Sequence, residues 1–372
     1  MPPRRHRAPH QRRALAARRR GARGSRSRGG ERRIESPGTP AAGKSPARTA
    51  LTIAIGVALL AFLLYHAGVD AVWERLQVLG WWSPLILVPY LVIGCFDTFA
   101  WRITLPAEAR PRIPFHTLYF VRMAGEAVNS VTPTAAVGGE PLKAYMLRPY
   151  GVSGGDGMAS VVIAKTALTA AQSLFTALGV AAMLDRLGRP GLALALMVTL
   201  LVLSVGFTLG LVWMQRRNPA SAVWRWLRRV FPRAAFVTRM EGGVSALDRR
   251  LADFYHVERG SFFRASSSNM VGWLLGVVET QVMLTLIGYP VAWEEALIIE
   301  ALAQPIRAAA IVVPGGIGTQ ELGGVWLCTY LGMAEPVAIT LWLLKRAREL
   351  VFDGIGLIYL ARTTAGKTLK TA

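Results

Sequence analysis

The chain of 372 residues is 52% hydrophobic and only 17% charged, a composition typical of a protein that crosses a membrane several times. Its two cysteines and five scattered histidines give no disulfide framework and no set of metal ligands. The glycine-rich phosphate loop of nucleotide-hydrolysing proteins is also missing from the sequence, so we expect no nucleotide engine and no cofactor.

The net charge of +21 is concentrated in residues 1–50, which hold 15 Lys and Arg against 2 Asp and Glu, a balance of +13. This segment is rich in Arg, Gly, Ser and Pro and has few large apolar residues, so we expect a disordered basic cytoplasmic tail. Nucleic-acid binding is one interpretation of such an arm. Attraction to anionic lipid and orientation of the first span explain the same charges, so we expect a lipid surface, and no nucleic acid, as its partner.

Six apolar runs are long enough to be full spans of an all-α membrane protein: residues 51–67, 84–105, 158–184, 192–214, 262–288 and 336–361. We expect Trp101, near the end of the second run, to lie at the membrane interface as an aromatic anchor.

A different composition separates the fourth run from the fifth. Residues 215–264 hold 11 Arg against 4 Asp and Glu, and apolar residues recur in them at spacings of three and four. This pattern predicts an amphipathic helical insert, residues 215–262, on the cytoplasmic membrane face. Binding of a partner is the alternative use of the same apolar stripe.

Residues 115–147 differ from an ordinary span, because the sequence Asn-Ser-Val-Thr-Pro-Thr at 129–134 interrupts two shorter apolar runs. Four charged residues accompany this interruption: Arg122, Glu126, Glu140 and Lys143. We therefore predict a broken helical hairpin.

A second interruption, Val-Pro-Gly-Gly-Ile-Gly-Thr-Gln-Glu at 313–321, lies between the apolar runs 293–313 and 322–333. Non-helical chain at membrane depth persists only where protein buries it or a watery cavity solvates it. If a helix restarts after Gly318, its N–H groups and its positive dipole end favour an anionic group. A surface turn between two ordinary spans is the alternative.

Counting the membrane crossings between the basic loops predicts the topology. With the tail inside, every strongly basic loop falls on one side, which places both termini and residues 215–264 in the cytoplasm and Glu294 and Glu335 outside. Parity does not distinguish a re-entrant hairpin from two full spans. Two re-entrant hairpins would enter from opposite faces, as in an inverted repeat.

Ionisable residues inside spans are costly and are therefore candidates for function. Around the second interruption the cations outnumber the nearby acids of the last span: Arg307, Lys345, Arg346 and Arg348 against Glu349 and Asp353. Lys165 adds a cation without an evident local partner. Surplus cations beside helix N-termini suit a phosphate, and an internally neutralised structural network is the alternative.

We expect no enzymatic activity, because the few histidines assemble neither a Ser-His-Asp triad nor a zinc site. An intramembrane transferase that uses Glu126, Glu140 or Glu321 as a base is the alternative.

The order and spacing of these motifs resemble the flippase-like membrane domain of the lysylphosphatidylglycerol synthase family, which includes the UPF0104 proteins. The resemblance covers about residues 50–362 and rests on three groups of residues: Asn129, Pro133, Gly139-Glu140 and Lys143; the segment from Pro314 to Glu321; and Lys345-Arg346 with Glu349. The run from Gly272 to Glu349 is most similar to the subfamily associated with hopanoid biosynthesis.

The resemblance implies a multi-pass inner-membrane protein that translocates or handles an amphipathic lipid, whether phospholipid, glycolipid or hopanoid-type. It implies a flippase-like domain over residues 51–362 and a short cytoplasmic tail over 363–372. Because no soluble aminoacyl-transferase domain follows, lipid lysylation is not expected. Lipid-biosynthesis enzymes are candidate partners, and a non-transporting scaffold for such enzymes is a further alternative.

The two broken hairpins are expected to line the path of the lipid headgroup. The predicted site residues are Arg122, Glu126, Asn129, Pro133, Gly139, Glu140, Lys143, Lys165, Glu300, Gln304, Arg307, Pro314, Gly315, Gly316, Gly318, Glu321, Lys345, Arg346, Arg348 and Glu349.

Overall fold

The computed structural model describes residues 77, 80–131, 138–186, 188, 190–217, 219–230, 235–309 and 318–368, all within the unit Ser45–Ala372. Among these residues the regular structure is helical and no strand occurs, as the apolar runs predicted. The basic tail, the first expected span at 51–67 and both interruptions, at 132–137 and 310–317, lie outside the described residues.

Five of the expected spans correspond to long helices: α3 (Leu87–Thr104), α6 (Gly154–Arg186), α7 (Pro190–Gln215), α10 (Arg259–Leu286) and α13 (Glu335–Thr368). A 3-10 segment, η3 (Gly80–Ile86), leads into α3. Within the described residues, Pro84–Thr104, α6 and α10 are long and apolar enough to cross a bilayer. α13 is as long as α6 but carries charged residues near its centre, and it continues beyond the expected end at residue 361.

The two interrupted elements are pairs of short helices in contact. α4 (Phe115–Val131) pairs with α5 (Gly139–Met146), and α11 (Trp293–Ala309) pairs with α12 (Thr319–Tyr330). At about 1.5 Å per residue, α5 and α12 reach only about 12 and 18 Å, well short of a hydrocarbon core of about 30 Å. Both elements are therefore re-entrant hairpins.

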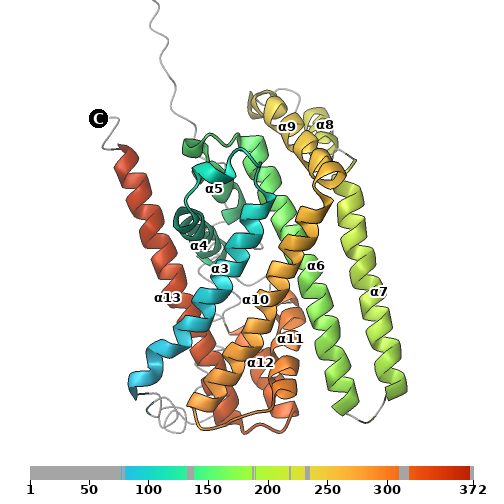
Figure 1. Cartoon of the computed structure of the whole chain (residues 1–372), viewed down its shortest axis with the longest axis vertical. Helices are drawn as coiled ribbons and strands as arrows, with labels where there is room; N and C mark the ends of the chain where they lie inside the picture. The colour runs from blue at the N-terminus through green and yellow to red at the C-terminus, as the bar shows by residue number, and fades with distance from the viewer. Residues whose placement is uncertain are drawn as a thin grey trace, which may run out of the picture. The chain divides into compact units, whose positions relative to one another are not determined.

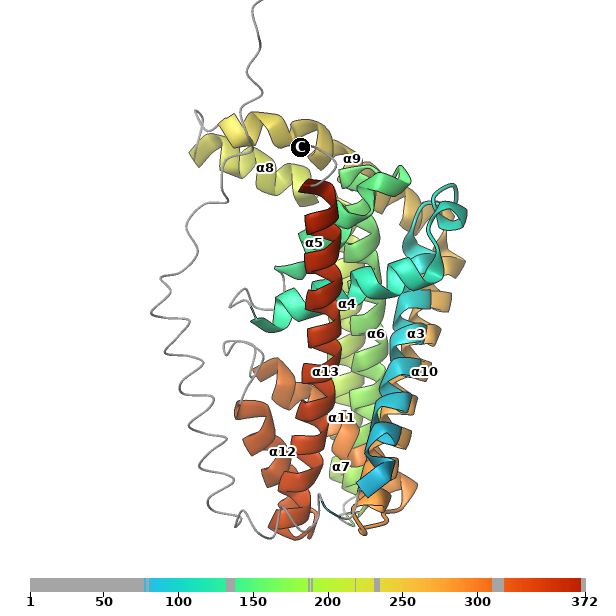
Figure 2. The ribbon, with the colours of Figure 1, turned by 90° about the vertical axis from the view of Figure 1, so that its left-hand side faces the viewer.

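The hairpins lie toward opposite ends of the helical bundle (Figures 1 and 2). The long helix that follows each hairpin packs against the first limb of the other one, α6 against α11 and α13 against α4, while α3 packs along α10. This exchange of partners between hairpins of opposite entry is the arrangement of an inverted repeat.

The basic loops meet at one end of the bundle, as charge parity predicted. α8 (Pro219–Val230), α9 (Ala235–Val257) and the C-terminal end of α13 lie there (Figure 1), together with the short segments η4 (Arg110–Arg112) and η5 (Arg148–Tyr150). Arg110 Nη2 lies 2.9 Å from Glu258 Oε2, which ties the loop after α3 to the start of α10. At the other end, Arg186 Nη1 lies 3.3 Å from Glu295 Oε2.

The predicted insert contains two helices, α8 and α9, and the apolar stripe of α9 serves mainly for packing. Leu251, Phe254 and Tyr255 of α9 are buried against Ala159 and Ile163 of α6. On α8, by contrast, apolar side chains such as Val223 and Trp226 are more than half exposed. The expectation that both helices rest on the membrane surface therefore suits α8, whereas α9 is docked on the bundle.

The expectation for Trp101 was wrong. Its side chain is buried, packs with Leu105, Leu118 and Val161, and donates from Nε1 to Ser160 Oγ at 3.2 Å. A tryptophan near the end of a span satisfies its N–H either at the interface or with a protein partner. Only the position of α6 provides that partner.

Candidate functional site

The first polar cluster lies where α3, α4, α5 and α6 meet, and its members are Asp97, Arg122, Glu126, Asn129, Glu140, Lys143 and Lys165. On α4 the three polar residues are spaced by four and three, which places them on one face of the helix. That face meets α5, which contributes Glu140 from its first turn and Lys143 from its last turn.

Lys143 is the centre of this cluster. Its Nζ lies 2.6 Å from Glu126 Oε1 and 3.2 Å from Glu140 Oε2. Glu140 also pairs with Lys165, at 3.4 Å. Arg122 Nη1 lies 3.3 Å from Asp97 Oδ2. Three cations thus face three carboxylates, so the first polar cluster is neutral as a set.

The structure explains why residue 139 is a glycine. A Cβ at this residue would overlap the backbone carbonyl of Gly125 on α4, which cannot move aside as a flexible side chain could. Its backbone N–H donates to Asn129 Oδ1 at 2.7 Å. Glycine therefore allows the start of α5 to approach α4 closely enough for Asn129 to bond to it.

The first polar cluster surrounds a cavity of about 60 Å³. Charged groups line one part of it, and apolar side chains such as Trp101 and Leu168 line another. Two buried donors at its edge, Arg122 Nε and Asn269 Nδ2, have no hydrogen-bond partner among the described residues. A space of this size holds a few water molecules, and the orphaned donors suit an acceptor such as a headgroup oxygen.

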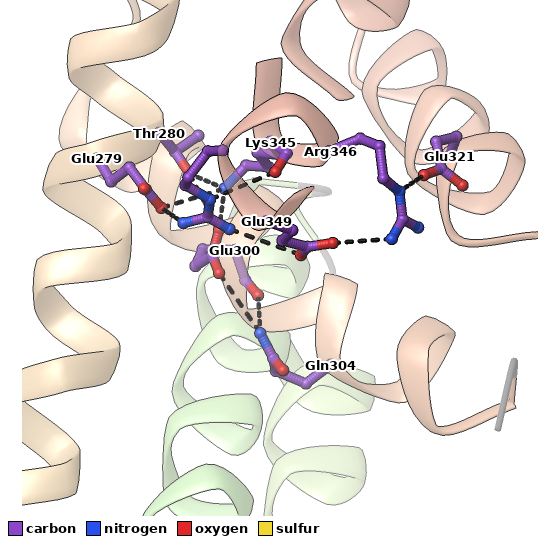
Figure 3. Close-up of polar contacts among 9 residues, drawn as sticks. Glu279, Thr280, Glu300, Gln304, Glu321, Lys345, Arg346 and Glu349 are labelled. Carbon is purple, nitrogen blue, oxygen red and sulfur yellow. Dashed lines mark hydrogen bonds and ion pairs between the residues drawn. The ribbon is translucent and has the colours of Figure 1, made fainter. Parts of the chain in front are cut away.

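The second polar cluster lies where α10, α11, α12 and α13 meet (Figure 3), and its members are Glu279, Thr280, Glu300, Gln304, Glu321, Lys345, Arg346, Arg348 and Glu349. Lys345 is almost completely buried and forms its centre. Its Nζ lies 2.7 Å from Glu300 Oε2 and donates to Thr280 Oγ1 at 2.9 Å. Gln304 donates to the backbone carbonyl of Glu300 at 3.0 Å.

Two arginines of α13, Arg346 and Arg348, both reach Glu349 but otherwise have different partners. Arg348 pairs with Glu279 of α10, and its guanidinium lies 4.1 Å from the ring centre of Tyr90. Arg346 lies on the other side and bridges Glu321 at 2.5 Å and Glu349 at 3.0 Å (Figure 3).

The expected surplus of cations around the second interruption is corrected by these contacts. Counting only α13 and its neighbours in sequence overlooked three carboxylates that other helices bring in: Glu279, Glu300 and Glu321. With Glu349 and Asp353 these make five carboxylates near the four cations, of which Lys345, Arg346 and Arg348 form ion pairs. Lys165 likewise has a partner, Glu140. The neutralised network is thus what the fold contains.

Arg307 is the cation of this region that remains without a hydrogen bond or ion pair to any described residue, and its Nε is buried. It occupies the last turn of α11, next to the second interruption. Gly318 is buried, has φ of +78° and directly precedes α12, so the helix does restart there. Four predicted site residues lie outside the described residues: Pro133, Pro314, Gly315 and Gly316.

The two hairpins place polar residues in the same register. α4 and α11 each have 17 residues, and their eighth, twelfth and fifteenth residues are Arg122, Glu126, Asn129 and Glu300, Gln304, Arg307 respectively. The twelfth residues of α6 and α13, Lys165 and Arg346, both pair with a glutamate in the first turn of the preceding hairpin limb. The second polar cluster thus repeats the plan of the first with altered charges.

Sequence reasoning did not include Asp97, Thr280, Tyr90 and Glu279 among the site residues, although the structure places them in these contacts. For Asp97 and Glu279 a signal was present, because each is a carboxylate inside an apolar span. Nothing in the local sequence distinguishes Thr280 or Tyr90 from residues that only pack.

Two re-entrant hairpins that hold buried ion pairs within a bundle of apolar helices define a polytopic α-helical membrane protein with charged groups inside its helical bundle. The chain belongs to the family described as Lysylphosphatidylglycerol synthase TM region, whose model matches residues 49–355.

The chain is also similar to a "UPF0104 membrane protein" of Methanothermobacter thermautotrophicus. The two are 24% identical over 313 residues, which is 80% of this chain and 90% of the relative. No solved structure matches the chain. The family resemblance is confirmed, whereas the link to the hopanoid-associated subfamily stays a prediction.

Proposed function

We propose that the protein is a flippase-like transporter that moves an amphipathic lipid between the leaflets of the inner membrane, with both termini in the cytoplasm. The observation that carries this proposal is the pair of buried polar clusters on re-entrant hairpins that enter from opposite ends of the bundle. A headgroup that crosses hydrocarbon needs polar partners at depth from both sides.

The charge balance of the clusters favours a headgroup that carries both signs of charge or several polar groups. An anionic phosphate replaces a carboxylate on Arg346 or binds Arg307, since guanidinium groups hold phosphate in a bidentate manner. The released glutamate then accepts from an ammonium or hydroxyl group of the same headgroup. Zwitterionic phospholipids, glycolipids and polar hopanoid-type lipids fit this pattern.

Translocation is proposed to proceed by exchange of ion pairs within one cluster and then within the other. The cost of breaking a buried pair is high when a charge is left alone, about 3–5 kcal/mol. A lipid headgroup lowers that cost because it supplies the missing partner. α13 packs against both α4 and α12, so a shift of this helix would affect both hairpins.

We further propose that the chain acts without enzymatic activity. The carboxylates considered as bases are each held by a cation in the structure: Glu126 and Glu140 by Lys143, and Glu321 by Arg346. Such pairing supports a structural and binding role. Lipid-biosynthesis enzymes are proposed as partners that supply or receive the lipid.

Reconstitution of the purified protein in liposomes that contain labelled lipid tests this function. We expect exchange of the label between leaflets with no change in its mass. A covalently altered lipid would establish the transferase, and vesicles with neither exchange nor modification would favour a scaffold. Liposomes with a Lys345→Met, Arg346→Ala variant serve as the control, because that variant lacks the central cations of the second polar cluster.

A further inference from the structure

A larger cavity, of about 760 Å³, lies between α6, α7 and α10, separate from both polar clusters. We call it the lateral groove. Its lining is mostly apolar and includes Ala170 and Ala171 of α6, Val205 and Leu209 of α7, and Phe262 and Met270 of α10. Small residues on α6 leave room between the two flanking helices. An apolar space of this size suits the acyl chains of a lipid.

Two arginines line the lateral groove at the end where α8 and α9 lie. Arg216 directly follows α7, and Arg259 is the first residue of α10. Neither makes an ion pair with a carboxylate that the structure describes. Arg216 Nη2 lies 3.2 Å from His256 Nδ1, and Arg259 Nε donates to the carbonyl of Tyr255 at 3.3 Å.

The nearest carboxylate in sequence does not neutralise this pair. Glu258 lies beside Arg259 in sequence, yet its two oxygens are taken by Arg110 at 2.9 Å and Arg250 at 2.7 Å. The charges of Arg216 and Arg259 therefore remain available at the mouth of an apolar groove. The chemistry that complements them is a phosphate.

The depth of the lateral groove matches one leaflet. Arg216 and Val205 are eleven residues apart on one side, and Arg259 and Met270 are eleven residues apart on the other. At about 1.5 Å per residue each side descends about 16 Å, which is about half of a 30 Å hydrocarbon core. A phosphate held by the arginines would thus have its acyl chains beside the apolar lining.

Buried hydrogen bonds fix the position of the backbone near Arg216 and Arg259 at the mouth of the lateral groove. Gln215 donates to Thr166 Oγ1 of α6 at 2.7 Å, and Tyr255 donates to Gln215 Oε1 at 2.7 Å. Burial raises the pKa of Tyr255 to about 12, so its hydroxyl keeps the proton for this bond. Lower in the groove, Ser266 Oγ is buried without a hydrogen-bond partner among the described residues.

We propose that the lateral groove holds one anionic phospholipid of the leaflet on the α8 and α9 side, with its phosphate between Arg216 and Arg259. This inference goes beyond the proposed translocation and does not depend on it, because the groove shares no lining residue with the cavity of the first polar cluster. The bound lipid joins α7 to α10 across a gap that side chains do not fill.

The test uses native mass spectrometry of the full chain from nanodiscs of phosphatidylglycerol, of phosphatidylcholine, or of both. We expect one phosphatidylglycerol retained in preference to phosphatidylcholine. Arg216→Gln with Arg259→Gln should weaken that preference roughly thirtyfold, since each of the two basic residues near the surface contributes about 1 kcal/mol toward an anionic lipid. The matched control is Arg225→Gln with Arg229→Gln, which removes the same charge from exposed positions of α8.

A second variant tests the groove independently of charge. Ala170→Phe fills the space beside α6 and should remove the retained lipid while both arginines remain. A photoreactive phosphatidylglycerol should crosslink to α7 and α10 in the native chain. Equal retention of both lipids by the native chain, or crosslinks only elsewhere, would overturn the proposal. So would a disulfide-linked dimer formed through Leu209→Cys, because it would assign the groove to a second copy.

Discussion

Arg346 of α13 lies 2.5 Å from Glu321 of α12, and Lys165 of α6 lies 3.4 Å from Glu140 of α5 in the corresponding position of the other hairpin. The two pairs occupy equivalent positions in the repeat, but they differ in how deeply they are buried. The Lys165 side chain is 46% exposed, whereas that of Arg346 is 12% exposed. The second hairpin is thus held by the more deeply buried contact.

Removing the two cations should therefore have unequal effects on stability. Arg346→Ala leaves Glu321 buried without its partner and should cost about 3–5 kcal/mol. Lys165→Ala should cost at most about 1 kcal/mol, because the Lys165 side chain is 46% exposed and the buried Glu140 keeps Lys143 as a partner. Thermal unfolding of both variants in detergent checks the order, and Arg346→Ala with Glu321→Gln should recover much of the loss. Equal melting shifts for the two single variants would contradict this account.

Arg307 offers the cleanest separation of binding from stability, because it makes no ion pair with a described residue. If it holds a headgroup phosphate, Arg307→Gln should remove a charge-assisted contact of about 1.5–3 kcal/mol, roughly a ten- to hundredfold loss in apparent lipid affinity. The melting temperature should stay close to that of the native chain. Leaflet exchange measured over a range of lipid concentrations gives the affinity. Unchanged transport would remove Arg307 from the headgroup path.

Gly139 should tolerate no side chain. In Gly139→Ala the new Cβ meets the carbonyl of Gly125, so we expect a loss of about 1–3 kcal/mol and a weakened contact between α4 and α5. Gly260→Ala is the matched control, because a Cβ there meets no atom within 4 Å. Melting temperatures of the two variants, together with lipid transport, test the argument. A Gly139→Ala protein as stable as the control would show that the hairpin does not need this approach.

Topology can be tested at two exposed positions, Asp253 on α9 and Ala334 between α12 and α13. In a chain without Cys95 and Cys328, we expect an impermeant maleimide added outside intact cells to label Ala334→Cys and not Asp253→Cys. The α8 and α9 end carries an excess of arginine, and segments rich in positive charge stay in the cytoplasm. The reverse pattern would place the basic insert outside and invert the proposed orientation.

Much of the fold could be predicted from the sequence because lipid leaves few solutions for a backbone. Long apolar runs must be helices, and interrupted ones must be buried or solvated. Five of the six expected spans and the limbs of both hairpins were therefore identified, with ends displaced by a few residues, while the span at 51–67 lies outside the described residues. The family could also be recognised, since the motifs around Glu140, Pro314 and Lys345 keep a distinctive order.

Which charged residues form ion pairs with each other was decided only by the tertiary structure. The sequence marks Lys345, Arg346 and Arg348 as unusual in a span, but their partners come from α10, α11 and α12, which are 25 to 69 residues away along the chain. An electrostatic pair depends on distance in space, and no local pattern encodes that distance. The apparent surplus of cations therefore disappeared once the helices were packed.

For the hairpins and the lateral groove, too, local features could be predicted from the sequence, whereas features that depend on the packing of distant helices could not. The sequence by itself determined that residues 115–147 and 293–333 are interrupted, because proline, glycine and buried charge are local properties. Whether those elements cross the membrane depended on the helix lengths of α5 and α12. The lateral groove depended on a gap between α7 and α10, whose mouth combines Arg216 and Arg259 from opposite ends of the insert. Such a site exists only after distant helices have packed, since neither helix carries it alone.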